Sequence, residues 1–213
     1  MAMDDLTLTS TPEAPAGARA ERMKQTRSAL RLAGLELFAT KGFEAVTAED
    51  IAAKAGVSRR TYFRYFRSKE EVLYLGERRF FEHFSTIFLG LPASVPDIDA
   101  VCATFAALAL RTVEGREALI LYRRAVDSST VLRGREQDHV HADLDLLGRA
   151  IAERRKLAEP DDRCRLLAAM SITAYRLAFA RWLDGPAPGD LAKEVVNEFA
   201  LMTAIAQRED PST

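Results

Sequence analysis

The stretch from Thr47 to Lys69 is TAEDIAAKAGVSRRTYFRYFRSK, and it decides the fold of the N-terminal part of the chain. Thr47 precedes two acidic residues, and a hydroxyl cap followed by negative charge favours the start of a helix. Gly56 lies where the chain must turn, and we expect a positive φ there because glycine has no Cβ. Ser58 then caps a second short helix. Two short helices joined at a glycine predict a helix-turn-helix unit.

The second of these helices has an inward and an outward side. Tyr62 and Phe66 are four residues apart and are expected to pack onto the preceding helix. The outward positions belong to the recognition helix, which in such units lies in the major groove of DNA. Arginine can bond guanine O6 and N7 there, and hydroxyls can reach phosphates or bases. The predicted DNA-binding residues are Ser58, Arg59, Arg60, Thr61, Phe63, Arg64 and Tyr65, with Lys69 holding the DNA backbone.

Charge is unevenly distributed along the chain. The 213 residues carry a formal net charge of −1, yet Arg19 to Lys69 contains twelve basic and five acidic residues and is near +7. A basic segment in an otherwise acidic chain predicts a region that binds a polyanion. A charged hairpin on the surface of a helical interaction protein is the alternative. It does not explain why Arg59, Arg60, Arg64 and Arg67 crowd one short helix.

The whole chain predicts an all-α fold, because apolar residues recur at helical spacing and no stretch alternates with a period of two. Besides the two short helices, we expect helices over 22–40, 68–89, 98–114, 116–126, 131–156, 160–183 and 190–207. Residues 1–20 are rich in Pro, Ala, Thr and Ser, and we expect a disordered arm there. The predicted domains are this arm, a helix-turn-helix domain at 21–68, and a ligand-binding and dimerisation domain at 69–213.

The spacing T-x-x-D-I-A-x-x-A-G-V-S-x-x-T-x-F-x-Y-F-x-S-K-E-x-x-L, from Thr47 to Leu73, resembles the signature of the tetracycline-repressor (TetR) family. The resemblance spans residues 27–75, since Ala33, Leu37, Phe38, Gly42 and Phe43 resemble that family's first helix and its end. It implies a nine-helix subunit with a three-helix DNA-binding domain. It also implies a homodimer that binds a palindromic double-stranded DNA operator, usually as a repressor.

Carried over by position, the resemblance implies that Thr47 contacts a phosphate from the start of the second helix, and that Tyr65 and Lys69 contact the DNA backbone. Two positions depart from the family pattern. Phe63 stands where the family often has a tyrosine, which removes one hydroxyl contact. Arg60 stands where a small residue is frequent, so Arg60 is our first candidate for an operator-specific contact.

The C-terminal part predicts a dimer face and a pocket. The last two predicted helices are rich in small and apolar residues, which suits a four-helix bundle built from two helices of each subunit. Ligand sites in bundles lie between helices and are mostly apolar. The candidate ligand-binding residues are Phe84, Phe105, Leu108, Leu121, Tyr122, Arg123, Met170, Ala174 and Tyr175, and plain core packing is the alternative for each.

The effector class is suggested by a narrower resemblance. The stretch from Ser58 to Phe66, together with Trp182, is similar to actinobacterial regulators related to the mycofactocin-system repressor. That resemblance implies an acyl-coenzyme A ester as the effector. A small hydrophobic molecule is the broader expectation.

Other functional classes have less support. No nucleotide-binding or hydrolase motif occurs, and we expect neither catalysis nor a cofactor. His139 and Asp143 are four residues apart and could share a metal, but a solvated surface is the simpler interpretation. Cys102 and Cys164 are far apart and are expected to be buried free thiols. The sequence has neither a signal peptide nor an apolar run long enough to span a membrane, so we expect a cytoplasmic protein.

Overall fold

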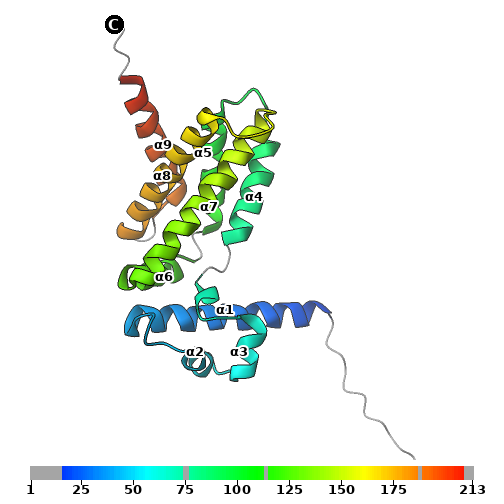
Figure 1. Cartoon of the computed structure of the whole chain (residues 1–213), viewed down its shortest axis with the longest axis vertical. Helices are drawn as coiled ribbons and strands as arrows, with labels where there is room; N and C mark the ends of the chain where they lie inside the picture. The colour runs from blue at the N-terminus through cyan, green and yellow to red at the C-terminus, as the bar shows by residue number, and fades with distance from the viewer. Residues whose placement is uncertain (1–15, 74–76, 113–114, 187–188, 209–213) are drawn as a thin grey trace, which may run out of the picture.

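The computed structural model describes residues 16–73, 77–112, 115–186 and 189–208, and every regular element in these ranges is a helix (Figure 1). The expected all-α fold is therefore confirmed. None of these helices is long and apolar enough to cross a membrane. The elements are α1 (Ala16–Lys41), α2 (Ala48–Lys54), α3 (Arg59–Tyr65), the 3₁₀ turn η1 (Glu70–Val72), α4 (Glu77–Gly90), α5 (Asp97–Thr112), α6 (Arg116–Ser128), α7 (Thr130–Arg154), α8 (Asp162–Asp184) and α9 (Leu191–Arg208).

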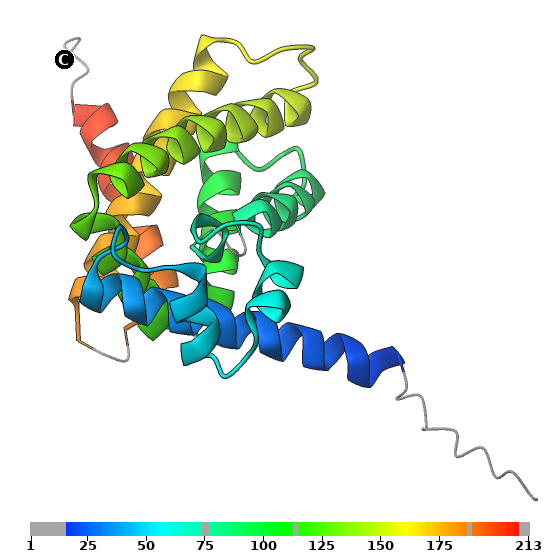
Figure 2. The ribbon, with the colours of Figure 1, turned by 60° about the horizontal axis from the view of Figure 1, so that its bottom comes forward.

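Two hydrophobic cores divide the molecule. The lower core joins α1, α2, α3 and η1 through buried side chains such as Leu30, Phe38, Ile51 and Tyr62. The upper core is formed by α4, α5, α7, α8 and α9, which stand as a bundle above α1 (Figures 1 and 2). Apolar burial of this extent, at about 25 cal/mol per Å², is the main force that holds each unit together.

The lower core extends beyond residue 68, the predicted end of the helix-turn-helix domain. Helix α6 contributes Ala125 and Val126 to the lower core, although we assigned all residues after 68 to the ligand-binding part. Val72, in η1, is also buried in the lower core. The sequence did not indicate that α6 belongs to this core, because α6 packs along α1, which is far from it in sequence. The lower unit of the fold is thus built from residues 16–73 together with α6.

Two predicted helices have different ends. The first begins at Ala16, so residues 16–20 are helical rather than part of an arm, while residues 1–15 lie outside the described part. The helix expected over 68–89 was wrong as a single element. Lys69 precedes the short turn η1, and α4 begins only at Glu77. The other expected helices are present with ends shifted by a few residues.

Gly34 is buried in α1 at the closest approach between α1 and η1. A Cβ at this position would lie 2.5 Å from Val72 Cγ1 and 3.5 Å from Ile51 Cδ1. Val72 is β-branched and has little rotamer freedom with which to yield. The glycine therefore allows α1 to pack closely against the elements that carry the recognition helix.

We expect Gly34→Ala to lower the free energy of unfolding, because the clash with Val72 costs about 1–3 kcal/mol. This outweighs the gain of up to about 1 kcal/mol that alanine brings to an unstrained helix. Urea unfolding of Gly34→Ala, Val72→Ala and the double variant measures the effect. Val72→Ala should make Gly34→Ala far less costly, with a coupling energy of about 1 kcal/mol or more. Additive effects would contradict the close-packing role.

Candidate nucleic-acid interface

The turn between α2 and α3 has the geometry that the sequence predicts. Thr47 is the N-cap of α2: its hydroxyl accepts from Asp50 N, and its backbone N donates to Asp50 Oδ2 at 2.9 Å. These hydrogen bonds to Thr47 hold the pKa of Asp50 below its usual value. Gly56 has a φ of 68°, the left-handed value expected for it. Ser58 caps α3 by accepting from Thr61 N at 3.1 Å.

One side of α3 is anchored. Tyr62 and Phe66 are fully buried, and the Tyr62 hydroxyl donates to Ser68 O at 3.0 Å. Burial raises the pKa of the Tyr62 phenol far above its usual value, so this group stays a neutral donor. The Arg27 guanidinium of α1 lies 5.6 Å from the Phe66 ring centroid. These contacts fix the rotation of α3 about its axis.

The opposite side of α3 is exposed. Arg60, Thr61, Phe63 and Arg64 line a hollow of about 460 Å³ on the lower face of the molecule. Phe63 is 44% exposed and gives this hollow an apolar part beside its cations. An outward helix face that combines cations, a hydroxyl and an aromatic ring suits contact with base edges and phosphates.

The three arginines of α3 differ in the contacts that their side chains already make with other residues of the chain. Arg59 forms an ion pair with Glu49 of α2, and its guanidinium lies 5.3 Å from the Phe63 ring centroid. Arg64 lies over the Tyr65 ring and approaches its hydroxyl at 3.4 Å. Arg60 is exposed, and within the described ranges it has no ion pair or hydrogen bond. Of the three, Arg60 therefore needs the least rearrangement to bind an external acceptor.

The structure gives Lys69 a role other than the predicted one. Its ammonium donates to the carbonyls of Phe43, Val46 and Glu44 at 2.7, 2.9 and 3.3 Å, and it lies 4.3 Å from the Phe43 ring centroid. A lysine has three donors, and all are used here. The expected phosphate contact of Lys69 is not available in this conformation, because the side chain instead secures the loop that leads from α1 to Thr47.

Two contacts that the sequence analysis missed join the DNA-binding unit to the bundle. Ser129, at the turn between α6 and α7, donates from its hydroxyl to Glu44 Oε1 at 2.6 Å and lowers the pKa of that carboxyl. Arg123 of α6 pairs with Asp184 at the end of α8. The partners of each pair are 61 or more residues apart in sequence, so no local signal could have indicated them.

The predicted ligand-binding residues are not brought together. Phe84, Phe105, Leu108 and Tyr175 lie in or against the upper core, where the rings of Phe105 and Tyr175 stack with centroids 4.6 Å apart. Leu121 and Tyr122 instead pack against the lower core. Ala174 also belongs to the upper core, and together with Met170 it lines a groove on the other side. Arg123 is engaged with Asp184. A single pocket from all nine is therefore not formed in this conformation.

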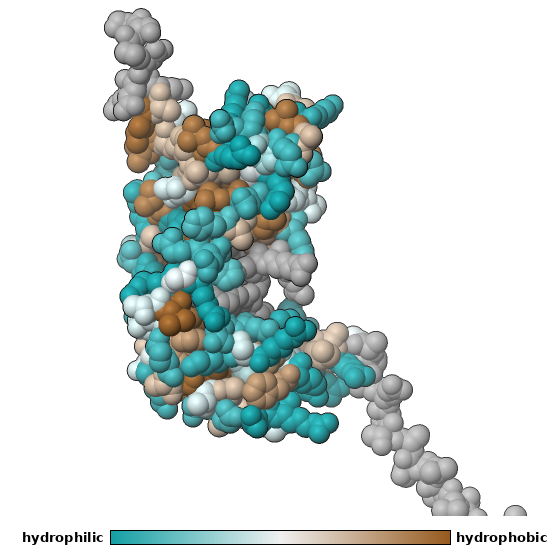
Figure 3. All heavy atoms as spheres, viewed as in Figure 1, coloured by the Kyte–Doolittle hydropathy of each residue, from teal (hydrophilic) through white to brown (hydrophobic). Residues whose placement is uncertain are grey.

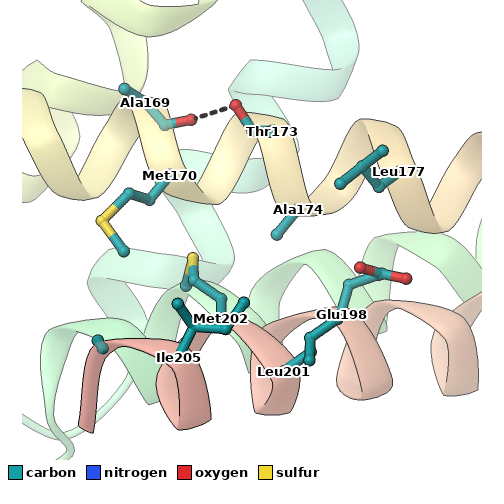
Figure 4. A pocket seen from close by; sticks show the side chains of 10 residues that line it. Ala169, Met170, Thr173, Ala174, Leu177, Glu198, Leu201, Met202 and Ile205 are labelled. Atoms are coloured by element: carbon teal, nitrogen blue, oxygen red, sulfur yellow. Dashed lines mark hydrogen bonds between the residues drawn. The ribbon is translucent and has the colours of Figure 1, made fainter. Parts of the chain in front are cut away.

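The groove that Met170 and Ala174 line runs between α8 and α9 and has a volume of about 460 Å³. Figure 4 shows the two methionines of the groove, Met170 and Met202, facing each other across it, with Leu177 and Leu201 nearby. Apolar side chains gather on the surface over these two helices (Figure 3). Five of them are at least half exposed: Leu166, Leu177, Val196, Leu201 and Ile205.

A polar cluster lies beside the upper core. Glu136 of α7 accepts from Tyr122 of α6 and lies 3.4 Å from an Arg176 nitrogen of α8. Burial and the neighbouring Glu136 raise the pKa of Asp143 to about 6, against the opposing effect of Arg176. His139 and Asp143 belong to no group of three His, Cys, Asp or Glu side chains that could hold a metal, in so far as the described residues show. The cluster thus acts as a hydrogen-bonded link between α6, α7 and α8.

Comparisons with known proteins agree with this geometry. Residues 30–74 match the family model described as bacterial regulatory proteins, tetR family. The chain is 37% identical over 106 residues to the HTH-type transcriptional regulator TcmR of Streptomyces glaucescens. It is 35% identical over 106 residues to MftR of Mycobacterium tuberculosis, described as a mycofactocin biosynthesis transcriptional regulator. Each match covers 50% of this chain and 46% of the relative.

The likeness to a solved structure extends over most of the chain. FadR of Thermus thermophilus, a TetR-family transcriptional repressor solved in complex with lauroyl-CoA, is 25% identical, with a TM-score of 0.55. The match covers 88% of this chain and 98% of FadR. The family model covers the capped α2–turn–α3 unit, and the structural match also takes in the helical bundle. Residues 30–74 thus carry the DNA-binding domain of the TetR family, and the helical fold of the chain is similar to that of a TetR-family repressor.

Proposed function

We propose that this protein is a repressor that binds a palindromic operator as a homodimer and is released by a small hydrophobic or acyl-coenzyme A-like effector. The observation that carries the proposal is the exposed face of α3, where Arg60, Thr61, Phe63 and Arg64 project from a helix fixed by Ser58, Tyr62 and Phe66. Its site of action would be the bacterial cytoplasm, where the operator DNA lies.

Each predicted DNA contact has a distinct role in the proposal. Arg60 reads a guanine through O6 and N7, and Thr61 contacts a neighbouring base or phosphate. Tyr65 and the start of α2 at Thr47 hold the DNA backbone and so fix the register of the recognition helix. Arg59 and Arg64 contribute positive charge, which strengthens binding to any sequence.

The homodimer is supported by the groove and the apolar surface of α8 and α9. Exposed apolar patches of this kind on a soluble protein mark interaction sites. A second copy related by a two-fold axis would bury the same patch on both subunits and complete a four-helix bundle. The two recognition helices would then face successive half-sites of a palindrome.

The effector response is supported by the position of α6. This helix shares a core with α1 through Ala125 and Val126, and it is tied to α7 and α8 through Tyr122 and Arg123. A ligand that parts the aromatic rings of the upper core, such as Phe105 and Tyr175, would move α8 and hence α6. The lauroyl-CoA bound to FadR supports an acyl-coenzyme A-like effector here. Linkage requires that such a ligand bind more tightly to the DNA-free arrangement.

Binding to a duplex that the protein has selected from a random-sequence pool tests this function. We expect the affinity to fall about a thousandfold between 50 and 200 mM salt, as for a protein with several phosphate contacts. Saturating lauroyl-CoA should lower the affinity at least about fivefold, whereas coenzyme A alone should not. A weak salt dependence with no sequence preference would favour the alternative of a helical interaction protein. Equal affinities with and without lauroyl-CoA would exclude that effector class.

A further inference from the structure

Helix α1 extends well beyond the DNA-binding domain that the family shares. The family match begins at residue 30, whereas α1 begins at Ala16. The 14 residues in between span about 20 Å at 1.5 Å per residue. Figures 1 and 2 show this segment projecting past α3, on the side away from α8 and α9. We call residues 16–29 the basic extension.

The basic extension is exposed and strongly cationic. From residue 17 to 29 every side chain is exposed except that of Thr26, which is half-buried. The segment contains Arg19, Arg22, Lys24 and Arg27 but only one acidic residue, Glu21. None of these four cations forms an ion pair within the described ranges. Glu21 is instead contacted by the side-chain amide of Gln25 at 3.4 Å.

Helical periodicity shows which way the cations point. Gly34 faces Val72 and Ile51, and hence the side of α1 on which α2 and α3 lie. Steps of about 3.6 residues back from Gly34 reach Leu30, Arg27, Met23 and then the pair Arg19 and Ala20. The contact between Arg27 and the Phe66 ring confirms this direction independently. Arg19 and Arg27 therefore lie on the side of α1 that carries the recognition helix, with Lys24 adjacent.

We propose that the basic extension is a second DNA-binding surface, which holds the phosphates of the duplex just outside the half-site that α3 reads. This inference rests on the proposed function. Duplex DNA is the occupant because the surface is strongly cationic and has little apolar area beyond Met23. It also adjoins the end of α3, where Arg27 lies over the Phe66 ring. A segment of about 20 Å corresponds to about six base pairs of flanking duplex.

The test combines flank length with a charge-removing variant. One duplex contains only the two half-sites of the selected operator, and a second adds about eight base pairs at each end. The variant Arg19→Gln, Arg22→Gln, Lys24→Gln keeps helix-forming residues, so α1 should stay intact. We expect the native protein to bind the longer duplex about tenfold more tightly than the shorter one. The variant should lose this gain, and the slope of log K against log salt should become less steep by about 2 to 5.

A matched variant controls for net charge. Arg149→Gln, Arg163→Gln, Arg165→Gln removes the same charge from exposed sites on α7 and α8 near the turn farthest from α3, and it should retain the flank effect. Equal binding of both duplexes by the native protein, or a full flank effect in the extension variant, would overturn the inference while leaving the proposed function intact. If neither the native protein nor any variant binds DNA with sequence specificity, the proposed function itself is refuted.

Discussion

Leu177→Glu is expected to convert the protein into a monomer and to lower its operator affinity about a hundredfold or more. Leu177 is 54% exposed on α8 and lines the apolar groove between α8 and α9. In a two-fold interface each substitution appears twice. Each copy loses about 1.5–3 kcal/mol of apolar burial and introduces a carboxylate that would be buried without a partner. A total of about 4 kcal/mol or more raises the dimer dissociation constant about a thousandfold.

Operator affinity falls when dimerisation is lost, because in the dimer two linked recognition helices bind the second half-site as an intramolecular event. Sedimentation velocity measures the oligomeric state, and fluorescence anisotropy on the selected duplex measures the affinity. Leu89→Glu is the matched control, since Leu89 is a partly exposed leucine on α4, away from the groove. It should remain dimeric and bind DNA normally. A dimeric Leu177→Glu protein with native affinity would show that the groove is not the subunit interface.

Much of the fold could be predicted because it is encoded locally. Thr47 and Ser58 cap helices through their own hydroxyls, and Gly42 and Gly56 adopt the positive φ values that helix ends and tight turns favour. These features depend on residues within one or two turns of each other. The outward face of α3 could also be predicted from the sequence. Once Tyr62 and Phe66 are placed inward, helical geometry determines which residues of α3 face solvent.

The features that were missed depend on tertiary contacts or on weak local signals. The contacts of Lys69 with three carbonyls join residues 23 to 26 positions apart in sequence, so no local pattern indicated them. Leu121 and Tyr122 resembled pocket residues, but α6 turns them toward the lower core. The start of α1 was missed because a Pro- and Thr-rich stretch precedes it, although the residues after Ala16 are mostly good helix formers. Local patterns thus predicted the capped helices and the turn of the helix-turn-helix better than the packing of the helices that follow.

The second large effect is expected from Arg60→Ala, which should weaken operator binding about 30-fold or more and relax the preference at one base pair of each half-site. Arg60 is exposed and, as far as the structure describes the chain, has no internal partner, so its guanidinium is available to DNA. A bidentate contact with guanine contributes about 1–3 kcal/mol, and the dimer makes two. Arg59→Ala should have a smaller effect, because Arg59 is already paired with Glu49.

The lysine variant distinguishes base recognition from simple charge. Arg60→Lys keeps the positive charge but cannot form the planar bidentate contact, so it should lose the base preference while retaining most of the salt dependence. Affinities measured on operators substituted singly at every position identify the base pair concerned. If Arg60 contacted only phosphate, Arg60→Lys would bind almost as tightly as the native protein with an unchanged preference. The base-specific contact would then be made by Thr61 or Arg64, the other polar side chains that line the exposed hollow on α3.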